Sequence, residues 1–258
     1  MSSNKEGLSR VLTVAFALCI VCSVVVSAAA VVLKPAQEVN KTRDLKRNIL
    51  MAAGLYDPSL SVEEQFERVT TRVVDIDSGT YVDGIDPDSF DSRAAAKDPA
   101  RSRALEAEED IAKIMRRSDH ALVYLVNDES GSLDKVILPI HGYGLWSTLY
   151  GFVALEADGN TIAGLGFYEH GETPGLGGEV DNPRWKSLWE GKQAYRDGDV
   201  AISVAKGAVN PQSAAADWQV DGLSGATLTS RGVSNLVQFW LGADGFQPFL
   251  TNLRRGDA

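Results

Sequence analysis

The sequence predicts an α+β protein in which a single N-terminal transmembrane helix is followed by a mostly antiparallel sheet with packed helices. Three observations support this fold class. Residues 11–33 contain no charged residue. Short β-like runs separated by turn residues fill the middle of the chain. The segment 228–241 has apolar residues at helical spacing, which predicts an amphipathic helix packed on the sheet.

The uncharged stretch 11–33 is long enough to cross a membrane. At about 1.5 Å per residue such a helix reaches ~34 Å, whereas the hydrocarbon core of a bilayer is about 30 Å thick. A cleaved signal peptide is the alternative, because the small residues 27–30, Ser-Ala-Ala-Ala, would suit a signal peptidase. The stretch continues past those alanines and exceeds the usual apolar region of a signal, which favours an anchor.

We expect four parts along the chain. An N-terminal tail covers residues 1–10, and the transmembrane helix covers 11–33. A juxtamembrane helix with a variable helical and loop region follows at 34–120. A β-rich domain then occupies 121–258. This division follows the change from mixed-charge helical patterns to short alternating runs near Ala121.

The third part carries several helix signals. Apolar residues at helical spacing in 34–57 predict the juxtamembrane helix. The S-x-x-E pattern at 61–64 has the form of a capping box and predicts a helix that continues to Val73. Residues 75–103 lack periodicity and predict a surface excursion, and a further, solvated helix is expected around 104–117.

The β-rich part shows short apolar runs that alternate with turn signals. Asp158-Gly159-Asn160 between two of these runs predicts a hairpin. Strands are expected at 121–126, 135–140, 149–155, 161–168 and 200–204.

Charge is distributed unevenly and excludes one class of function. Residues 1–10 carry a net +1 and residues 34–47 a net +3, so the chain total of −10 leaves −14 for residues 48–258. A body that acidic repels phosphate backbones, so we expect no nucleic-acid partner. The five basic residues in 34–47 outnumber the two before the apolar stretch, and the positive-inside rule alone would place the body in the cytoplasm.

The segment 221–227, which reads DGLSGAT, leads directly into the predicted C-terminal helix. Small residues let the backbone approach a ligand closely, and the first N–H groups of a helix form a natural seat for a phosphate. Thr227 would lie in the first turn with its hydroxyl near that seat. The alternative is an ordinary Ser/Thr cap on a glycine-rich turn.

This segment resembles the flavinylation motif of the FMN-binding domain family. In that family a flavin transferase esterifies FMN, through its phosphate, onto the threonine of the motif. The resemblance implies that Thr227 is the acceptor of a covalent FMN and that residues 121–258 are an FMN-binding domain. Four further residues of the motif would then contribute to the flavin site: Asp221, Ser224, Gly225 and Ala226.

A wider resemblance, to the C subunits of Na+-translocating NADH:quinone reductases, covers the N-terminal anchor and residues 141–155, 164–185, 221–227 and 239–250. It implies an electron-carrying flavoprotein subunit that is not catalytic alone and relays electrons between redox centres of partner subunits. It also implies a bacterial inner membrane location with the soluble domain in the periplasm, against the count of basic residues. The alternatives are the G-type subunit of Rnf electron-transport complexes, or a non-catalytic, membrane-anchored extracytoplasmic binding domain.

The loop 169–177, EHGETPGLG, is an irregular turn made by three glycines and a proline after a predicted strand. The resemblance implies that it lies against the flavin ring. Leu176 would then contact the ring beside Gly177, with Glu172 and Thr173 as polar partners. The alternative is a rigid turn in which Glu172 caps a neighbouring element.

Two more places complete the expected site. The resemblance implies that the turn Gly144-Leu145-Trp146-Ser147 approaches the cofactor, although Trp146 as a core residue is an alternative. Lys206 follows a strand before the motif, where a cation would stabilise an anionic reduced flavin. A solvated surface lysine is the alternative for Lys206.

Other chemistry finds little support in the sequence. The three histidines are far apart in the chain, so we expect no metal site. No G-x-S-x-G elbow, phosphate-binding loop or H-E-x-x-H pattern is present, and no dinucleotide fingerprint follows a strand. We therefore expect no catalytic residue of the chain's own and no binding of NADH by this chain.

Overall fold

The structure, a computed structural model, describes residues 7–258, so most of the expected tail 1–10 lies outside the described residues. The chain divides into two compact units, residues 1–45 and 46–258. The first unit holds most of one helix, and the second unit holds the sheet and every other helix of the described chain.

Helix α1, Leu8–Ala52, contains the expected anchor and continues through Pro35 without interruption. The juxtamembrane helix is therefore the last part of α1 rather than a separate element. The side chains of residues 9–44 are all exposed, including the apolar ones. By length and composition, α1 is the one helix in the described chain that could cross a membrane. A helix whose side chains are apolar on every side, as in residues 11–33, is stable when protein or lipid of low polarity surrounds it.

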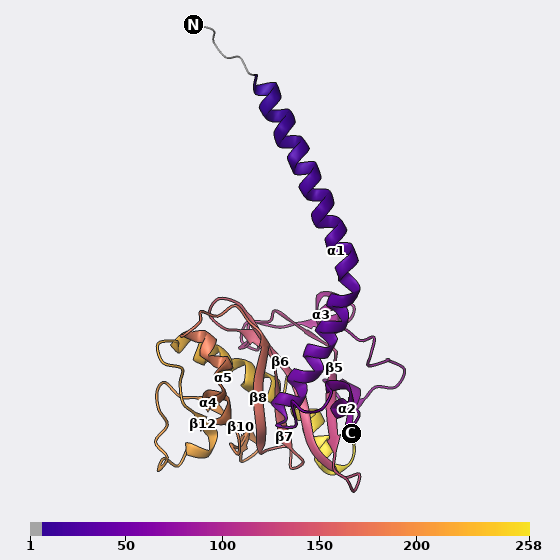
Figure 1. Cartoon of the computed structure of the whole chain (residues 1–258). Helices are drawn as coiled ribbons and strands as arrows, with labels where there is room; N and C mark the ends of the chain where they lie inside the picture. Colours follow the sequence, from indigo (N-terminus) through magenta and orange to yellow (C-terminus); the bar gives the residue numbers. More distant parts are fainter. Residues whose placement is uncertain (1–6) are drawn as a thin grey trace. The chain divides into compact units, whose positions relative to one another are not determined.

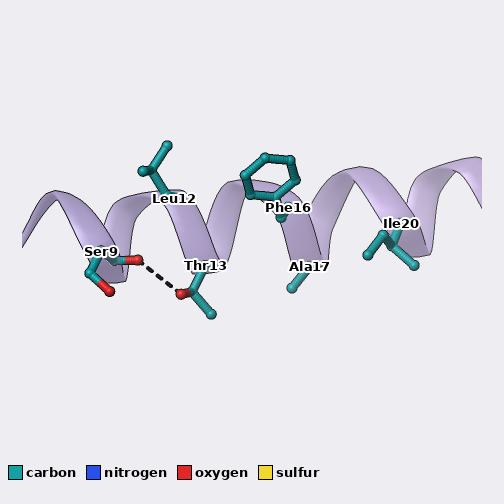
Figure 2. Close-up of a pocket in the computed structure, with 6 residues that line it drawn as sticks. All are labelled: Ser9, Leu12, Thr13, Phe16, Ala17 and Ile20. Carbon is teal, nitrogen blue, oxygen red and sulfur yellow. Dashed lines mark hydrogen bonds between the residues drawn. The ribbon is translucent and has the colours of Figure 1, made fainter.

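Figure 2 shows one face of α1 with the side chains of Ser9, Leu12, Thr13, Phe16, Ala17 and Ile20 along it. The hydroxyl of Thr13 donates to the carbonyl oxygen of Ser9 at 2.9 Å, so its polar group is satisfied within the helix. Internal satisfaction of this kind is what a helix in hydrocarbon requires. This face belongs to a single exposed helix, and we assign no site to it.

The body is built on a six-stranded, wholly antiparallel sheet with the order β2-β1-β5-β6-β7-β8. Figure 1 labels its strands β5 to β8. This sheet confirms the predicted α+β fold class. Its strands are β1 Val69–Asp75, β2 Thr80–Tyr81, β5 His120–Asn127, β6 Leu133–Tyr143, β7 Thr148–Glu156 and β8 Ile162–Glu169. Strands from both sides of the expected domain boundary at residue 121 share this sheet.

The hairpin predicted at Asp158-Gly159-Asn160 connects β7 to β8. The carboxylate of Asp158 accepts hydrogen bonds from the backbone N–H groups of Asn160 and Thr161, both at 2.8 Å. Gly159 has φ +64°, a left-handed conformation that a residue without a Cβ adopts at little cost. The turn therefore has a local cause that is visible in the sequence.

Two helix predictions in the segment before β5 need correction. Helix α2, Val62–Phe66, begins as predicted, with Ser61 accepting from the N–H of Glu64, but it ends after five residues. Val69 and Val73 lie in β1 instead, because the pairing of β1 with β5 buries them. Long-range strand pairing has overridden a local helical spacing here.

The helix expected around 104–117 is also wrong. That segment holds two short paired strands, β3 Ser102–Ala104 and β4 Arg116–Ser118, joined by turns. Lys113 and Met115 have positive φ angles in the connecting loop, which a right-handed helix does not allow. The surface excursion expected at 75–103 includes β2 and the short helix α3, Ser92–Lys97.

Helix α5, Thr227–Leu241, packs against β6 as the C-terminal periodicity predicts (Figure 1). Its inner face buries Val233, Leu236 and Val237 completely, and burying each such side chain contributes about 1.5–3 kcal/mol. The indole N–H of Trp240 donates to the carbonyl oxygen of His141 in β6 at 2.7 Å. These contacts hold α5 against the end of β6.

The remaining elements are short and lie mostly between β8 and the C-terminus. They are the 3-10 helices η1 Gly177–Asp181 and η2 Ala216–Trp218, the helices α4 Pro183–Ser187 and α6 Gln247–Arg255, and the strands β9 Tyr195–Arg196, β10 Asp199–Val200, β11 Ser203–Val204 and β12 Gln219–Val220. The expected strand at 200–204 is thus divided between β10 and β11. Strand β11 pairs in parallel with β12, which directly precedes the 221–227 motif.

Candidate functional site

Three segments far apart in the sequence meet around the first turn of α5. They are the turn 144–147 between β6 and β7, the loop 170–177 after β8, and the motif 221–227 before α5. Glu172 in the loop forms hydrogen bonds both to the turn and to the first turn of α5, which the motif leads into. The structure thus brings together most of the residues that the sequence pointed to.

Thr227 is the first residue of α5, and its side chain is exposed. The hydrogen-bond ladder of α5 starts with the N–H of Ser230 donating to the carbonyl oxygen of Ala226 at 2.9 Å. The N–H groups of residues 227–229 precede that ladder, and the N-cap residue Ala226 has no side chain that could accept from them. This helix end therefore offers free donors and a positive dipole beside an accessible hydroxyl.

The rest of the motif shapes the approach to this helix end. Ser224 and Gly225 are exposed, and Gly225 has φ +70°, a conformation that favours glycine. A Cβ at Gly225 would lie 3.0 Å from Leu176 Cδ2, so the loop and the motif are in contact there. Leu223 is buried, and its N–H donates to the hydroxyl of Ser230 at 3.0 Å.

Asp221 and Lys206 lie at the far end of the motif. The carboxylate of Asp221 accepts from the N–H of Val209, and its carbonyl oxygen accepts from the indole of Trp185, both at 2.8 Å. Asp221 thus connects the start of the motif to Val209 and Trp185 through hydrogen bonds. Lys206 is exposed, as the alternative of a solvated surface lysine expects. Its neighbour Gly207 accepts through its carbonyl oxygen from the N–H of Gly222 at 2.9 Å. The structure brings Lys206 to the beginning of the motif.

The turn 144–147 is organised by the carboxylate of Glu172. Its Oε1 accepts from the backbone N–H groups of Leu145 and Trp146 at 3.0 Å and from that of Ser147 at 3.4 Å. The Ser147 hydroxyl accepts in turn from the N–H of Gly171 at 2.6 Å. Glu172 therefore caps a neighbouring element, which is the alternative that the sequence left open for this loop.

The second oxygen of Glu172 binds α5. Oε2 accepts from the hydroxyl of Thr229 at 2.6 Å, and both side chains are buried, with Glu172 5% and Thr229 0% exposed. Burial opposes ionisation of Glu172, but the hydrogen bonds from Thr229 and from the turn outweigh it and lower its pKa. The site therefore contains an ionised carboxylate that is enclosed by donors.

His170 supports the same loop from its other side. Its Nδ1 accepts from the N–H of Glu172 at 3.2 Å, so its Nε2 carries the proton and donates to Asp181 at 2.8 Å. Thr173 is exposed, and its carbonyl oxygen accepts from the N–H groups of Leu176 and Gly178. The loop is thus closed by its own backbone and leaves Thr173 accessible.

Three large apolar side chains are exposed on these segments. Trp146 is 66%, Leu228 52% and Leu176 44% exposed, although most residues of this size in the body are buried. The exposure of Trp146 contradicts the alternative in which it is a core residue. Apolar side chains beside free backbone donors suit a ligand with a planar apolar ring and an anionic group.

Sequence reasoning missed Thr229 and Ser230 as parts of the site. Thr229 lies four residues before Val233, on the same face of α5 as the buried apolar residues, where a polar side chain requires a partner. That signal was available from the helical spacing. The identity of the partner, Glu172, was not available, because 57 residues separate the two.

Comparisons with known proteins agree with this geometry. The family model described as FMN-binding domain matches residues 144–242, a range that contains all three segments of the site. Residues matching an FMN-binding domain thus surround Thr227.

Relatives match almost the whole chain. The C subunit of the Na(+)-translocating NADH-quinone reductase of Pseudomonas aeruginosa is 58% identical over 99% of this chain and 100% of its own length. The corresponding protein of Haemophilus ducreyi is 46% identical over 97% of this chain and 96% of its own. The crystal structure of Shewanella oneidensis NqrC superimposes with a TM-score of 0.77 at 42% identity, covering 84% of this chain and 99% of that one.

The fold and site define the chain as a protein with an FMN-binding domain. The sequence identities, which extend over nearly the full length of both chains, also show the particular family. The chain belongs to the family of C subunits of Na(+)-translocating NADH-quinone reductases.

The lowered pKa of Glu172 predicts a pH dependence of stability. The ionised carboxylate stabilises the folded state above the ordinary pKa of 4.5, and this contribution disappears as the pH falls through the lower folded-state pKa. At pH 7 we expect Glu172→Gln to lower the free energy of unfolding by about 1–3 kcal/mol, because hydrogen bonds to a charge are lost. The difference from wild type should shrink below pH 4.5. Thermal unfolding of both proteins, from neutral pH down to about one pH unit below 4.5, measures this difference in stability.

Wild type and Glu172→Gln share the other carboxylates with lowered pKa, such as Asp75 and Asp158, so these cancel in the comparison. A difference that stays constant over the whole acid range would contradict an ionised Glu172.

Gly177→Ala should destabilise the body. A Cβ at Gly177 would lie 2.5 Å from Thr229 Oγ1 and 2.7 Å from Glu172 Oε2, so the buried pair would have to separate. We expect a loss of about 1–3 kcal/mol in urea unfolding. Gly166→Ala is the matched control, because the nearest atom to its Cβ, Ala52 Cβ, is 4.0 Å away. Equal effects of the two substitutions would refute the steric argument.

Proposed function

We propose that this chain is the electron-carrying flavoprotein subunit of a Na+-pumping NADH:quinone oxidoreductase, holding one FMN covalently through a phosphoester on Thr227. The observation that carries the proposal is that Thr227, which bears a hydroxyl, is exposed at the start of α5, where no side chain caps the helix. Family membership and the FMN-binding domain match support the coarser part, a subunit of this oxidoreductase complex with an FMN-binding domain.

The residues around Thr227 fit FMN chemically. The phosphate of FMN is an anion, and the N–H groups of residues 227–229 with the helix dipole favour an anion at that position. The isoalloxazine ring is planar and largely apolar, and Trp146, Leu176 and Leu228 offer exposed apolar surface on the segments that meet there. Ser224, Gly225 and Ala226 would line the phosphate end, with Thr173 and Gly177 in the loop.

The choice of Thr227 over its neighbours follows from accessibility. Thr229 and Ser230 are buried, and their hydroxyls already bond to Glu172 and to the N–H of Leu223. Ser224 is exposed but precedes the helix. Thr227 alone among these combines an exposed hydroxyl with the helix donors.

The attachment is a transfer of the flavin phosphoryl group to a hydroxyl. A bond forms between Thr227 Oγ1 and the flavin phosphorus, and the hydroxyl proton leaves. With FAD as the donor, the phosphoanhydride bond breaks and AMP is the leaving group. No electron moves in this step, so the flavin keeps its oxidation state.

The chain's part in electron transfer is to bind and orient. FMN supplies the redox chemistry when bound, and no residue of the chain is a catalytic group in the proposal. Electrons would come from a redox centre on one partner subunit and pass to another. A covalent bond retains the cofactor where free FMN would diffuse away. Lys206 at the beginning of the motif would favour a reduced, anionic ring.

In this proposal the chain is a single-pass protein of the bacterial inner membrane. Helix α1 has the length and composition of a membrane span, and its uncharged part supports an anchor. We propose that the body faces the periplasm and that a flavin transferase of the host matures it. Relatives named as C subunits at 43–58% identity favour this assignment over the Rnf complex and over a binding domain without flavin.

Thr227→Ala should abolish covalent flavin. We expect wild type, expressed with a flavin transferase in a host that exports it, to gain the mass of FMN less one water, with the modification on Thr227. The alanine variant should show the mass of the bare chain and no flavin fluorescence after denaturation, because no hydroxyl remains to form the ester. Intact mass spectrometry and peptide sequencing measure both.

Two variants complete that experiment. Thr227→Ser retains a hydroxyl and should keep some covalent flavin, and Thr70→Ala, at an exposed threonine of β1, should keep all of it. Covalent FMN on Thr227→Ala would move the attachment point elsewhere.

The orientation of the body gives a separate prediction. In spheroplasts, where the inner membrane is intact, added protease should digest the acidic body while a cytoplasmic marker stays whole. Immunoblotting for a C-terminal epitope reads the result. Protection of the body until detergent is added would place it in the cytoplasm, as the five basic residues of 34–47 suggest.

A further inference from the structure

We propose that Glu172 is a positioning residue of the flavin site rather than a ligand of the flavin, and that its bond to Thr229 presents Thr227 for attachment. The inference rests on the proposed function, because it concerns how the acceptor threonine is held. It departs from the sequence expectation that Glu172 is a polar partner of the ring.

The hydrogen bonds of Glu172 leave little capacity for a ligand. Oε1 of Glu172 accepts from the N–H groups of Leu145, Trp146 and Ser147, and Oε2 accepts from the hydroxyl of Thr229. Since each carboxylate oxygen has about two acceptor positions, Oε1 is filled and Oε2 keeps one. The side chain is 5% exposed. An ionised carboxylate has no proton to donate, and Oε2, the oxygen with a remaining acceptor position, lies against Gly177.

The surroundings of Glu172 leave no room for another arrangement. A Cβ at Gly144 would lie 2.6 Å from its Oε1, and a Cβ at Gly177 would lie 2.7 Å from its Oε2. The two glycines therefore allow the backbone to close around the carboxylate. The close contact of Gly144 and Gly177 with the carboxylate fixes the separation between the turn 144–147 and the first turn of α5. The loop 170–177 lies between them.

Thr229 transmits this constraint to the acceptor. In an α-helix successive residues are about 100° apart, so Thr229 and Thr227 project about 200° apart around α5. The bond from Thr229 to Glu172 holds one side of the first turn against the body. Thr227 lies on the other side of the helix and is exposed. The N-cap residue Ala226 makes no side-chain cap, so the bonds of Thr229 and of Ser230, whose hydroxyl accepts from the N–H of Leu223, are the side-chain bonds that order this helix end.

Helix α5 also packs directly on the turn, one helical turn beyond Thr229. A Cβ at Gly232 would lie 2.6 Å from the carbonyl oxygen of Tyr143 and 2.9 Å from Gly144 Cα, so the helix touches the end of β6 and the start of the turn there. That contact sets the distance between helix and sheet. The bond between Thr229 and Glu172 instead orders the first turn, which includes the acceptor.

The test compares the rate of flavin attachment in Thr229→Val and Thr229→Ser. Full-length chain in detergent is incubated with purified flavin transferase and FAD, and covalent flavin is followed by in-gel fluorescence and intact mass. Valine matches threonine in shape but cannot donate, whereas serine can. We expect attachment to Thr229→Val to be roughly tenfold slower, the typical effect of losing one hydrogen bond to a charged group. Thr229→Ser should stay within about twofold of wild type.

Thermal unfolding of each apo variant separates positioning from folding. Rates are compared at a temperature well below every unfolding midpoint, where a purely structural Thr229 would leave the rate unchanged. Glu172→Gln is a second variant that keeps the shape and removes the charge, and it should be about threefold slower. The attachment rate of Glu172→Gln tests the inference even if Thr229→Val does not fold.

The outcomes are distinct. Wild-type rates in Thr229→Val and Glu172→Gln, or a Thr229→Ser as slow as Thr229→Val, would overturn the inference and leave the proposed function intact. A wild-type chain that accepts no flavin would overturn the proposed function and this inference together. Slow attachment in Thr229→Val with rescue by serine supports both.

Discussion

The arrangement of the site depends on one buried charge, the carboxylate of Glu172. Removing an ionised carboxylate from water costs several kcal/mol unless its acceptor positions are filled. Here the carboxylate belongs to the loop 170–177, and its hydrogen-bond donors belong to the turn 144–147 and to helix α5. The three segments must therefore meet in one geometry. Exposed residues nearby, including Trp146 and Thr227, take their positions from that constraint.

The first turn of α5 combines two features that usually conflict. It is anchored to the body, and its backbone donors remain accessible. A conventional cap would satisfy the donors and block an anion. In this helix the hydroxyl of Thr229 donates to Glu172 and anchors the first turn to the body. Ala226 at the N-cap position has no side chain that could accept from the first N–H groups, so these donors remain accessible. Small residues at Gly225 and Gly177 give the close approach that this arrangement needs.

The errors of sequence-based reasoning concentrate in the segment before β5. Val69 and Val73 have a helical spacing, but they lie in β1 because β5, about 50 residues further along the chain, offers a partner strand. The charged pattern of 104–117 also suggested a helix, whereas the segment is held as β3, a loop and β4. Local patterns contain no information about a distant partner, and pairing in a buried sheet outweighs a weak propensity.

The sequence by itself determined the elements that local chemistry controls. The uncharged stretch 11–33, the Asp158 hairpin, the strands β5 to β8 and the amphipathic helix α5 all follow from composition, turn residues and periodicity. The motif at 221–227 and the acceptor candidate Thr227 were also visible there. Only the tertiary structure decided that Glu172 pairs with Thr229, that Trp146 is exposed and that β1 joins the sheet. These features depend on contacts between residues far apart in the chain, which form only when the whole body folds.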